Sequence, residues 1–507
     1  MIQINDHVSF NCLGCRRVAR KQASKDADHR VFLQQENAMS AASPTTIATD
    51  PARSTAASND WPALWQTLSQ GVGVGRYTDP QFTRLEFEKL WSRVWQVAAR
   101  IDEIPEQGDY TTYRIGDQSI LLVRVDESTI KAFYNFCPHR GTTLGHGCGH
   151  FDGGKIICPY HGWRWDLQGN IKLVLERNEF CDGKLQDGDV AMREVHSRVF
   201  AGFVFINLDP NPESFDDFIA PLRQFLDDIV LGDMRHIWWK RTVIPCNWKV
   251  AQEAFYEAYH VSATHPQLEK VGREVVYGDR PDGPMMYRDL TYDAFEHGHG
   301  QFYGGDKTPM AGHVQEPKST DDLLEEMAAR MNLTAEGLGA MILKEDIELL
   351  LTLRGKHLPP GTNLGAEYVR LQYETAAKLS RPMPKPTPEI IGRWGGVTVA
   401  FPNVLVLLQA GSAALYRVLP HATDPNQCTF EIRSVKTYPA GVKTPRAVVE
   451  DITDPEQVGL IPRQDLGNLP RVQEGLRSTG MRQAWLASNQ EKLILNMHRE
   501  LDRYLRS

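Results

Sequence analysis

The 507-residue chain lacks several features that would place it in other protein classes. Its 56 Lys and Arg residues against 64 Asp and Glu give a net charge of −8, so it has none of the basic excess typical of nucleic-acid-binding proteins. Its apolar runs are shorter than the roughly 18–20 residues needed to span a bilayer. A Gly-x-Gly-x-x-Gly fingerprint after a strand is also missing. We therefore expect no nucleic acid, no membrane and no nicotinamide bound directly to this chain.

Cysteine is scarce as well. Eight Cys in a chain of this length do not form a disulfide scaffold, and they fit thiols reserved for metal in a cytoplasmic enzyme. Cys12 and Cys15 are an isolated Cys-x-x-Cys pair in a polar tail. Residues 1–58 are rich in small and polar residues without periodicity, and we expect them to be disordered. Met39 opens a more ordinary start, so we expect the first 38 residues to be absent from the mature protein.

Hydrophobic periodicity divides the remainder of the chain. Residues 59–94 have helical spacing and are expected to form a helical lead-in. Residues 95–210 change to a period of two, which predicts a compact all-β unit that ends before a Pro-Asn-Pro sequence. Residues 211–507 combine strands and helices without β-α-β alternation. The sequence therefore predicts an α+β fold.

Within the last segment, four stretches bear on the later argument. We expect Asn247–His265 to be largely helical and Trp485–Leu505 to form a closing amphipathic helix. We expect residues 277–315, which are rich in Gly, Asp and Tyr, to form a loop. The long stretch 277–380 exceeds what a core sheet needs, and it is a candidate lid.

Two matched loops offer two thiols and two imidazoles. Cys137-Pro-His139 is followed, after 18 residues, by Cys158-Pro-Tyr-His161. Proline stiffens each loop, and the glycine that comes four residues after each Cys allows the backbone to approach closely. These ligands suit zinc, and they also suit a [2Fe–2S] cluster in which two His replace two Cys on one iron. The flanking residues favour the cluster, because such loops direct N–H groups toward the sulfides.

The two motifs, Cys-Pro-His-Arg-Gly and Cys-Pro-Tyr-His-Gly-Trp, resemble the Rieske signature of the large (alpha) subunit of Rieske non-haem iron aromatic ring-hydroxylating oxygenases. The resemblance implies that Cys137, His139, Cys158 and His161 hold a Rieske [2Fe–2S] cluster. It also implies a Rieske domain at 95–210, followed by a catalytic domain of antiparallel sheet flanked by helices (helix-grip, START-like). A structural zinc site is the alternative interpretation.

A second motif bears on a mononuclear iron site, for which two His and one carboxylate are the usual ligands in O₂ chemistry. After Asn247-Trp-Lys, Glu257 is followed by His260 three residues later and by His265 five residues after that. Residues three apart share a helical face, whereas residues five apart do not. The helix is therefore expected either to distort, for example through a π-type turn, or to end before His265.

In the same family, the pattern Glu/Asp-x-x-His-x₄-His carries two iron ligands, which implies His260 and His265 here. The family takes its third ligand from an Asp upstream of Gln-x-Gly-Leu. That register implies Asp465, with Asp451 and Asp454 as alternatives. The family more often has Asp where this chain has Glu257. That carboxylate connects a cluster His of one subunit to an iron His of the next, which implies a catalytic role for Glu257 and a homotrimer.

The resemblance implies the terminal component of a mono- or dioxygenase. It would use O₂ and electrons from NAD(P)H, delivered by a separate reductase with or without a ferredoxin, to hydroxylate a bulky, apolar, aromatic small molecule at a mononuclear Fe(II). The homotrimer is expected with or without a small beta subunit. The residues expected to line the substrate pocket are Phe255, Tyr256, Phe401 and Gln409.

Two alternatives remain open at this point. Some relatives that act on quaternary ammonium substrates also carry Glu at the position of Glu257, so the chain could be a Rieske monooxygenase or demethylase for a quaternary amine. Such a substrate needs an aromatic cage, for which Trp238 and Trp239 are candidates. The non-enzymatic alternatives are a Rieske electron carrier, which would need only residues 95–210, and a zinc-binding module.

Overall fold

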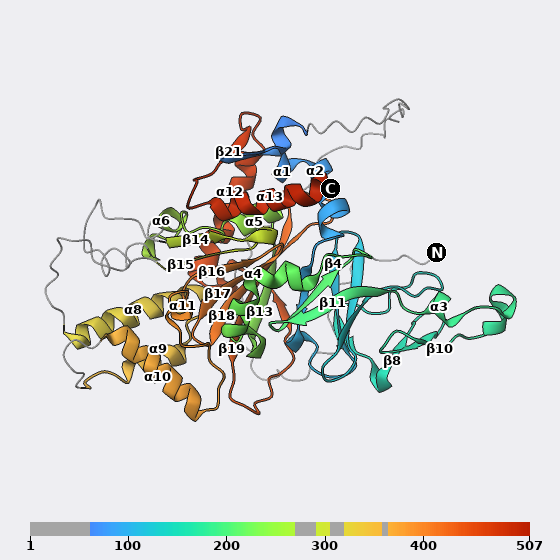
Figure 1. Cartoon of the computed structure of the whole chain (residues 1–507), viewed down its shortest axis with the longest axis horizontal. Helices are drawn as coiled ribbons and strands as arrows, with labels where there is room; N and C mark the ends of the chain where they lie inside the picture. Colours follow the sequence, from blue (N-terminus) through green and yellow to red (C-terminus); the bar gives the residue numbers. More distant parts are fainter. Residues whose placement is uncertain (1–60, 269–289, 305–318, 357–362) are drawn as a thin grey trace, which may run out of the picture. The chain divides into compact units, whose positions relative to one another are not determined.

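The computed structural model describes residues 61–268, 290–304, 319–356 and 363–507 (Figure 1). The expected disorder of residues 1–58, the Cys12–Cys15 pair and the start at Met39 lie outside the described residues. The described part combines antiparallel sheets with flanking helices, which confirms the predicted α+β class. No described helix combines the length and the apolar character needed to cross a membrane.

The β-rich unit expected at 95–210 is built on a seven-stranded antiparallel sheet in the order β3-β12-β11-β6-β5-β4-β7. Its strands are β3 (Gln96–Arg100), β4 (Asp109–Ile115), β5 (Gln118–Arg124), β6 (Ile130–Tyr134), β7 (Cys148–His150), β11 (Glu194–Phe200) and β12 (Phe203–Asn207). A three-stranded sheet comprises β8 (Lys155–Ile157), β9 (Arg164–Asp166) and β10 (Ile171–Leu173). Both Cys of the matched loops lie in the apolar core that these two sheets share, together with Trp163 and Trp165.

An eight-stranded sheet in the order β14-β15-β16-β17-β18-β19-β13-β20 forms the centre of the C-terminal part. Its strands are β13 (Met234–Ile244), β14 (Leu290–Ala294), β15 (Gly300–Gly304), β16 (Val397–Ala400), β17 (Val404–Gln409), β18 (Ser412–Pro420), β19 (Cys428–Thr437) and β20 (Val449–Asp451). All neighbours are antiparallel except β13 and β20. The loop expected at 277–315 is therefore wrong for residues 290–304, where a turn at Glu296–Gly298 joins the edge strand β14 to its neighbour β15.

Helices pack on one face of this sheet (Figure 1). The helix α5 (Trp248–Glu253) lies against β18 and β19, and α12 (Leu460–Leu476) contacts both α5 and β13. The closing helix α13 runs over Lys492–Arg506, and Trp485, the first residue of its predicted range, instead ends the short strand β21 (Gln483–Trp485). Helix α4 (Phe215–Asp228) follows the β-rich unit in the chain. Ser214 caps its N-terminus, because the Ser214 side chain accepts a hydrogen bond from the backbone N–H of Asp217.

The lead-in contains short helices, α1 (Gly75–Thr78) and α2 (Pro80–Glu86), and a π-helix, η2 (Phe87–Trp91). Asp79 begins α2, because its side chain accepts a hydrogen bond from the backbone N–H of Gln81. Two strands that the helical spacing did not predict, β1 (Thr67–Leu68) and β2 (Gly71–Gly73), form a small sheet with β21.

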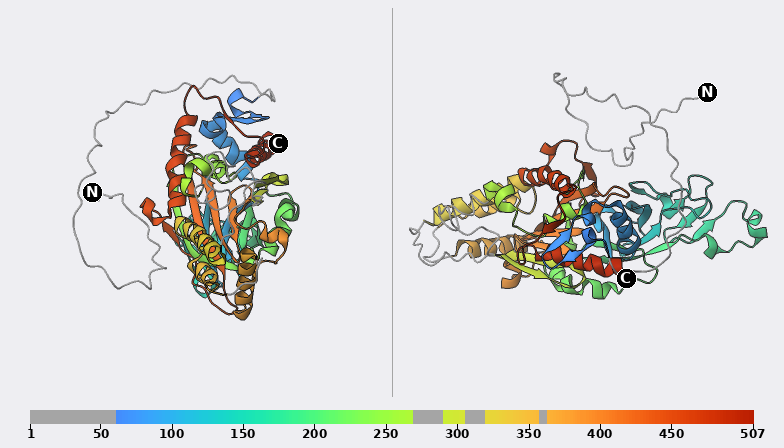
Figure 2. Two further views of the ribbon diagram at one scale, coloured as in Figure 1. Left: turned by 90° about the vertical axis from the view of Figure 1, so that its left-hand side faces the viewer. Right: turned by 90° about the horizontal axis from the view of Figure 1, so that it is seen from above.

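Three helices within the long stretch 277–380 form a group of their own (Figure 2). They are α8 (Thr320–Leu338), α9 (Lys344–Leu351) and α10 (Leu364–Lys378), and a four-residue helix, α11 (Pro388–Ile391), follows them. Their separate apolar core includes Leu324, Leu350 and Tyr368. Gly339 directly follows the last residue of α8 and ends the helix. Its φ of 69° is the left-handed conformation that glycine adopts without strain.

Buried ion pairs join the β-rich unit to the eight-stranded sheet. Glu103 Oε1 lies 2.6 Å from Arg433 Nη1, and Glu431 Oε1 lies 2.9 Å from Arg417 Nη2. Arg417 also donates to the backbone carbonyl of Ala98 in β3. Burial alone would raise the pKa of Glu431, but the two Arg residues outweigh it and lower that pKa to about 2. The carboxylate therefore stays ionised and fixes Arg417 and Arg433, the two residues that reach the β-rich unit.

Candidate metal centres

The two Cys/His loops close in the same way. The N–H of Gly141 donates to the carbonyl of Cys137 at 2.9 Å, and the N–H of Gly162 donates to the carbonyl of Cys158 at 3.0 Å. Both glycines have positive φ, 81° and 69°, so each loop needs a residue without a side chain at this point. The repeated geometry explains the repeated sequence, and it places both thiols in the core of the domain, each about 2 % exposed.

The two His rings meet at the tips of these loops. Their ring centroids are 4.6 Å apart, and Trp163 stacks on His139 with a centroid distance of 4.8 Å. Tyr160 covers His161 with a centroid distance of 3.9 Å, and its own side chain is 56 % exposed. One side of the pair is therefore packed against the domain core, and the other side reaches the surface.

These loops fit a Rieske cluster. The Nδ1 atoms of His139 and His161 are buried and have no hydrogen-bond partner among the described residues, which is costly unless an iron occupies those positions. Burial lowers the pKa of His139, and the neighbouring His161 and Arg140 lower it further, which favours the neutral imidazole that a metal ligand must be. Burial raises the pKa of Cys137 to about 11, so the thiol keeps its proton unless a bound metal displaces it.

The second site is built around the four-residue helix α6 (Val261–Thr264). His260 is the residue immediately before it, and His265 is the residue immediately after it. Pro266 follows His265 and prevents the helix from continuing. The expectation of one largely helical segment is wrong, because α5 already ends at Glu253 and the chain turns before His260. The five-residue spacing between the two His is met because α6 ends at Thr264, before His265, which is one of the two alternatives that the spacing predicted.

The structure brings the three predicted iron ligands together. One ligand atom from each of His260, His265 and Asp465 lies within 4.8 Å of the others. Asp465 Oδ1 is 3.0 Å from Nε2 of His265 and 3.7 Å from Nε2 of His260, and the two rings are inclined by 73°. Asp465 lies in α12 and is 4 % exposed, so a distant helix supplies the carboxylate, as expected. Two His and one carboxylate on one side of a common point are the ligand set of non-haem iron oxygenases.

Glu257 supports this site from outside it. Its Oε1 lies 2.7 Å from Nδ1 of His260, and its Oε2 accepts a hydrogen bond from the backbone N–H of the same residue at 3.0 Å. Burial disfavours the charged imidazole, but the hydrogen bond and charge of Glu257 outweigh it, so the pKa of His260 lies above its ordinary value. The other ring has a different partner: Nδ1 of His265 lies 2.8 Å from Oε1 of Gln464, a residue that the sequence reasoning did not identify. Its position directly before Asp465 was the available signal.

The four residues expected to line the substrate pocket lie in the segment after α5 and near the two ends of β17. Phe255 packs edge-on against Tyr416, with a centroid distance of 4.6 Å, and also contacts Phe430. Tyr256 is fully buried and hydrogen-bonds Gln252. Phe401 follows β16 and packs against Gly298, and Gln409 is the last residue of β17. Tyr416 was missed, although it lies near the iron ligands: burial raises its pKa, and the negative charge of Asp465 raises it further.

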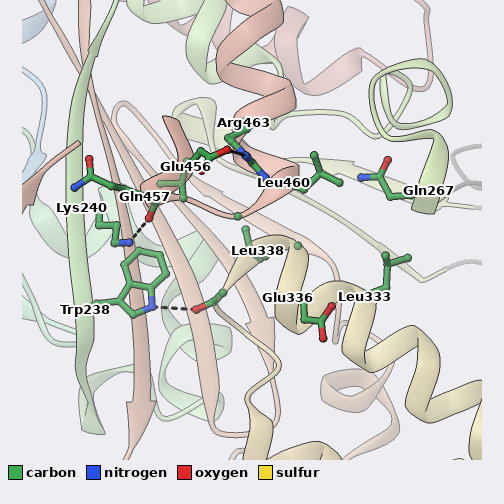
Figure 3. A pocket seen from close by; sticks show the side chains of 14 residues that line it. Trp238, Lys240, Gln267, Leu333, Glu336, Leu338, Glu456, Gln457, Leu460 and Arg463 are labelled. Atoms are coloured by element: carbon green, nitrogen blue, oxygen red, sulfur yellow. Dashed lines mark hydrogen bonds and ion pairs between the residues drawn. The ribbon is translucent and has the colours of Figure 1, made fainter. Parts of the chain in front are cut away.

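The rings of the two Trp proposed as an aromatic cage are each covered by a cationic side chain of the protein itself. Lys240 Nζ lies 5.4 Å from the ring centroid of Trp238, and Arg433 Cζ lies 4.1 Å from that of Trp239. Trp238 lines a cavity of about 480 Å³ between β13, the end of α8 and the start of α12 (Figure 3). Its indole N–H donates to the carbonyl of Gly339. The cage expected from Trp238 and Trp239 is therefore not formed.

Comparisons with known families agree with this geometry. Residues 231–507, more than half of the chain, match the family described as ring hydroxylating alpha subunit (catalytic domain). Residues 94–180 match the Rieske [2Fe–2S] domain. The zinc-binding alternative and the pure electron carrier are thereby set aside, because the chain has both the cluster domain and the catalytic domain.

Individual relatives are similar over parts of the chain. The glycine betaine monooxygenase oxygenase subunit of Chromohalobacter salexigens is 34% identical over 217 residues, which is 42% of this chain and 47% of the relative. The carnitine monooxygenase oxygenase subunit of Escherichia coli (strain K12) is 36% identical over 194 residues, 38% of this chain and 50% of the relative. The biphenyl dioxygenase subunit alpha of Metapseudomonas furukawaii is 28% identical over 276 residues, 50% of this chain and 57% of the relative. The matches thus span about half the length of these relatives.

Solved structures share the fold. The quaternary ammonium Rieske monooxygenase CntA in complex with gamma-butyrobetaine superposes with a TM-score of 0.57 at 18% identity, covering 88% of this chain and 99% of that chain. Naphthalene 1,2-dioxygenase from Rhodococcus sp. bound to indole gives a TM-score of 0.55 at 20% identity, covering 86% and 94%. The chain belongs to the ring-hydroxylating alpha subunit family, with a Rieske [2Fe–2S] domain and a catalytic domain that carries a His-His-Asp site for mononuclear iron.

Proposed function

We propose that this chain is the terminal oxygenase component of an enzyme that hydroxylates a quaternary ammonium compound, using O₂ and electrons from NAD(P)H delivered by a separate reductase. The observation that carries the oxygenase activity is the convergence of His260, His265 and Asp465 in a chain that also has the two cluster loops. When bound, the cluster supplies single electrons and the mononuclear iron supplies open positions for O₂.

The quaternary amine is favoured over the bulky aromatic substrate for two reasons. Relatives named for glycine betaine and carnitine are 34% and 36% identical to the matched segments, whereas biphenyl dioxygenase is 28% identical. The second reason is Glu257, which stands where the ring-hydroxylating pattern more often has Asp. In this chain the Glu reaches back to its own His260 with both oxygens, so the longer side chain is accommodated.

The residues of this chain have distinct parts in the reaction. Glu257 holds the proton on Nδ1 of His260 and so leaves Nε2 free to bind the metal. Tyr416 presents a hydroxyl that is hydrogen-bonded to no described residue, close to Asp465, and we assign it to substrate contact. Phe255, Tyr416 and Phe430 pack against one another, so they form one aromatic wall beside a cation and do not enclose it.

The overall reaction is balanced as a monooxygenation. The substrate C–H bond, O₂, two electrons and two protons give the C–OH product and one water. Hydroxylation at a carbon bonded to the quaternary nitrogen makes the C–N bond labile, so the product separates into a tertiary amine and an aldehyde.

The surface around the cluster supports assembly into a homotrimer. Three apolar side chains near the loops are strongly exposed: Tyr160 at 56 %, Leu175 at 50 % and Ile157 at 44 %. Arg140 lies over the Tyr160 ring at 5.3 Å and adds a positive charge to this patch. In the proposed ring, the patch of one subunit packs near Glu257 of the next, so that electrons pass between subunits. A reductase would reach the cluster from another direction.

Ring dioxygenation of an aromatic compound is the second candidate. The aromatic wall of Phe255, Tyr416 and Phe430 favours it, since stacked and edge-on rings also suit an aromatic ligand. The match to biphenyl dioxygenase subunit alpha over half of this chain points the same way.

Product analysis separates the two candidates. Purified oxygenase with a compatible reductase and NADH or NADPH would be incubated with betaines, carnitine, choline-type amines, biphenyl and naphthalene. The proposal predicts aldehyde and tertiary amine from a quaternary compound, in one-to-one ratio with the NAD(P)H consumed. Formation of a cis-diol from an aromatic compound, with quaternary amines unchanged, would establish the second candidate and refute the first.

A further inference from the structure

The two iron-site histidines are held by chemically different groups. His260 has a carboxylate behind it, since Glu257 Oε1 lies 2.7 Å from its Nδ1. His265 has a neutral amide behind it, since Gln464 Oε1 lies 2.8 Å from its Nδ1. A carboxylate partner makes an imidazole more basic and a stronger donor to a metal than an amide partner does. The two ligands of one metal are therefore unequal.

The amide of Gln464 is itself fixed in orientation. Its Oε1 also accepts a hydrogen bond from Nε2 of Gln267 at 2.7 Å, and its Nε2 donates to Oε1 of Gln267 at 3.1 Å. A reciprocal amide pair is also satisfied when both amides are reversed, so His265 decides the orientation. Its Nε2 lies toward Asp465 at 3.0 Å, on the side where a metal would bind, which leaves the proton on Nδ1 to donate to Oε1 of Gln464.

We propose that Gln464, held by Gln267, is the positioning residue for His265 and that its neutral amide sets how tightly the site retains Fe(II). Asp465 and Glu257 together carry two negative charges, which balance the two positive charges of Fe(II) without a third carboxylate. The inference rests on the iron chemistry of the proposed function, but it does not depend on which substrate is used.

The position of the amide pair argues against a role in packing alone. Gln267 lines one end of the 480 Å³ cavity, where Figure 3 shows its amide facing Leu460. Both glutamines are only partly buried, so neither fills the apolar core. The pair therefore forms part of the partition between a cavity and the metal ligands. Shortening either side chain opens this partition and leaves the domain core intact.

Metal affinity tests the inference without substrate. The variants are Gln464→Ala, Gln464→Glu and Gln267→Ala, with Glu336→Gln as the matched control because Glu336 lines the same cavity away from the pair. Fe(II) and Co(II) dissociation constants of the mononuclear site would be measured by competition with a chelator. We expect affinity to fall about ten- to a hundredfold in Gln464→Ala and by a smaller factor in Gln267→Ala. Gln464→Glu should bind at least as tightly as the native chain, and Glu336→Gln should not differ from it.

A second readout separates positioning from general stability. In the Co(II)-loaded protein, the Nδ1–H protons of His260 and His265 should each give an exchangeable, paramagnetically shifted NMR signal. In Gln464→Ala the His265 signal should disappear or exchange faster with solvent, and the His260 signal should not change. In Gln464→Glu both signals should be present as in the native chain. Retention of both signals in Gln464→Ala, with affinity within twofold of the native chain, would overturn the inference. Equally weak binding in Gln464→Ala and Gln464→Glu would overturn it too. If Gln464→Ala does not fold, the metal affinities and His265 signals of Gln267→Ala and Gln464→Glu test the inference in its place.

Discussion

Glu257 contacts His260 twice: its Oε1 lies 2.7 Å from the ring Nδ1, and its Oε2 accepts a hydrogen bond from the backbone N–H at 3.0 Å. One carboxylate thereby fixes the ring of a metal ligand and the start of α6 together. Each of its oxygens retains a further lone pair, and the side chain is 8 % exposed. It can therefore still accept a hydrogen bond from a cluster His of a neighbouring subunit.

Removing this carboxylate should separate metal binding from electron transfer. In Glu257→Ala we expect both metals to be retained and turnover to fall at least a hundredfold, because His139 and His161 of one subunit lose their link to the next iron. The measurement is metal content together with stopped-flow reoxidation of the reduced cluster. Glu257→Asp is the control, and should keep part of the activity. A turnover rate equal to that of the native chain in Glu257→Ala would remove the bridge from the account.

Asp465→Ala should empty the mononuclear site and spare the cluster. Two imidazoles alone bind Fe(II) weakly, so iron content should drop by one atom per chain while the visible spectrum is unchanged. Asp451→Ala is the matched control, because Asp451 was the competing candidate and its side chain is 66 % exposed in an ion pair with Arg241. Loss of iron from Asp451→Ala, or full iron occupancy in Asp465→Ala, would contradict the assignment.

The ligands could be predicted from the sequence because their spacing is local. The Cys and His residues of each loop lie within four positions of one another, and His260 and His265 flank one turn of helix. Asp465 is 200 residues from His265, and the family register located it. The break in the helix at Glu253 was not predictable from periodicity, since Gln252–Tyr259 contains no proline or glycine.

The support of the site depends on tertiary contacts, which the sequence pattern does not encode. Gln464 was missed because its position directly before Asp465 does not by itself show whether its amide faces His265 or solvent. The pocket residues show the same limit: Phe255 and Phe401 are both apolar and near a motif, yet they pack against different elements. The strands β14 and β15 were missed because glycine and aspartate mark turns more often than strands.

Glu431→Gln should destabilise the junction between the two domains. Removing the carboxylate leaves Arg417 buried without an acidic partner and leaves Arg433 with Glu103 alone, so the free energy of unfolding should fall by about 3–5 kcal/mol. Denaturant unfolding followed by fluorescence and by the cluster absorbance gives the value. Glu374→Gln, which breaks the exposed pair with Arg370, should cost less than about 1 kcal/mol. Equal losses in the two variants would show that the buried network does not hold the domains together.

Glu253 predicts a specific dependence of stability on pH. It hydrogen-bonds Tyr77 and lies 2.8 Å from Nε2 of His498, and burial raises its pKa to about 8. The ordinary value is 4.5, so the folded chain holds a proton that the unfolded chain releases. This stabilisation is complete below pH 4.5 and is lost as the pH rises through about 8.

The melting temperature of the native chain should therefore fall more between pH 6.5 and 8.5 than that of Glu253→Gln, whose amide does not titrate. Burial keeps the pKa of His498 well below its ordinary value, so this His stays neutral over the window. Differential scanning calorimetry of both proteins in matched buffers measures the difference. Parallel pH profiles would show that Glu253 is ionised in the folded chain.

The most direct test of the account is the iron and acid-labile sulfide content of the purified chain, read together with its visible spectrum. Two separate centres predict three irons and two sulfides per chain and the absorption of a Rieske cluster, with one iron removable by a chelator and the spectrum unchanged. Zinc in a colourless protein, or two irons and two sulfides with no further Fe(II) bound on reconstitution, would contradict it.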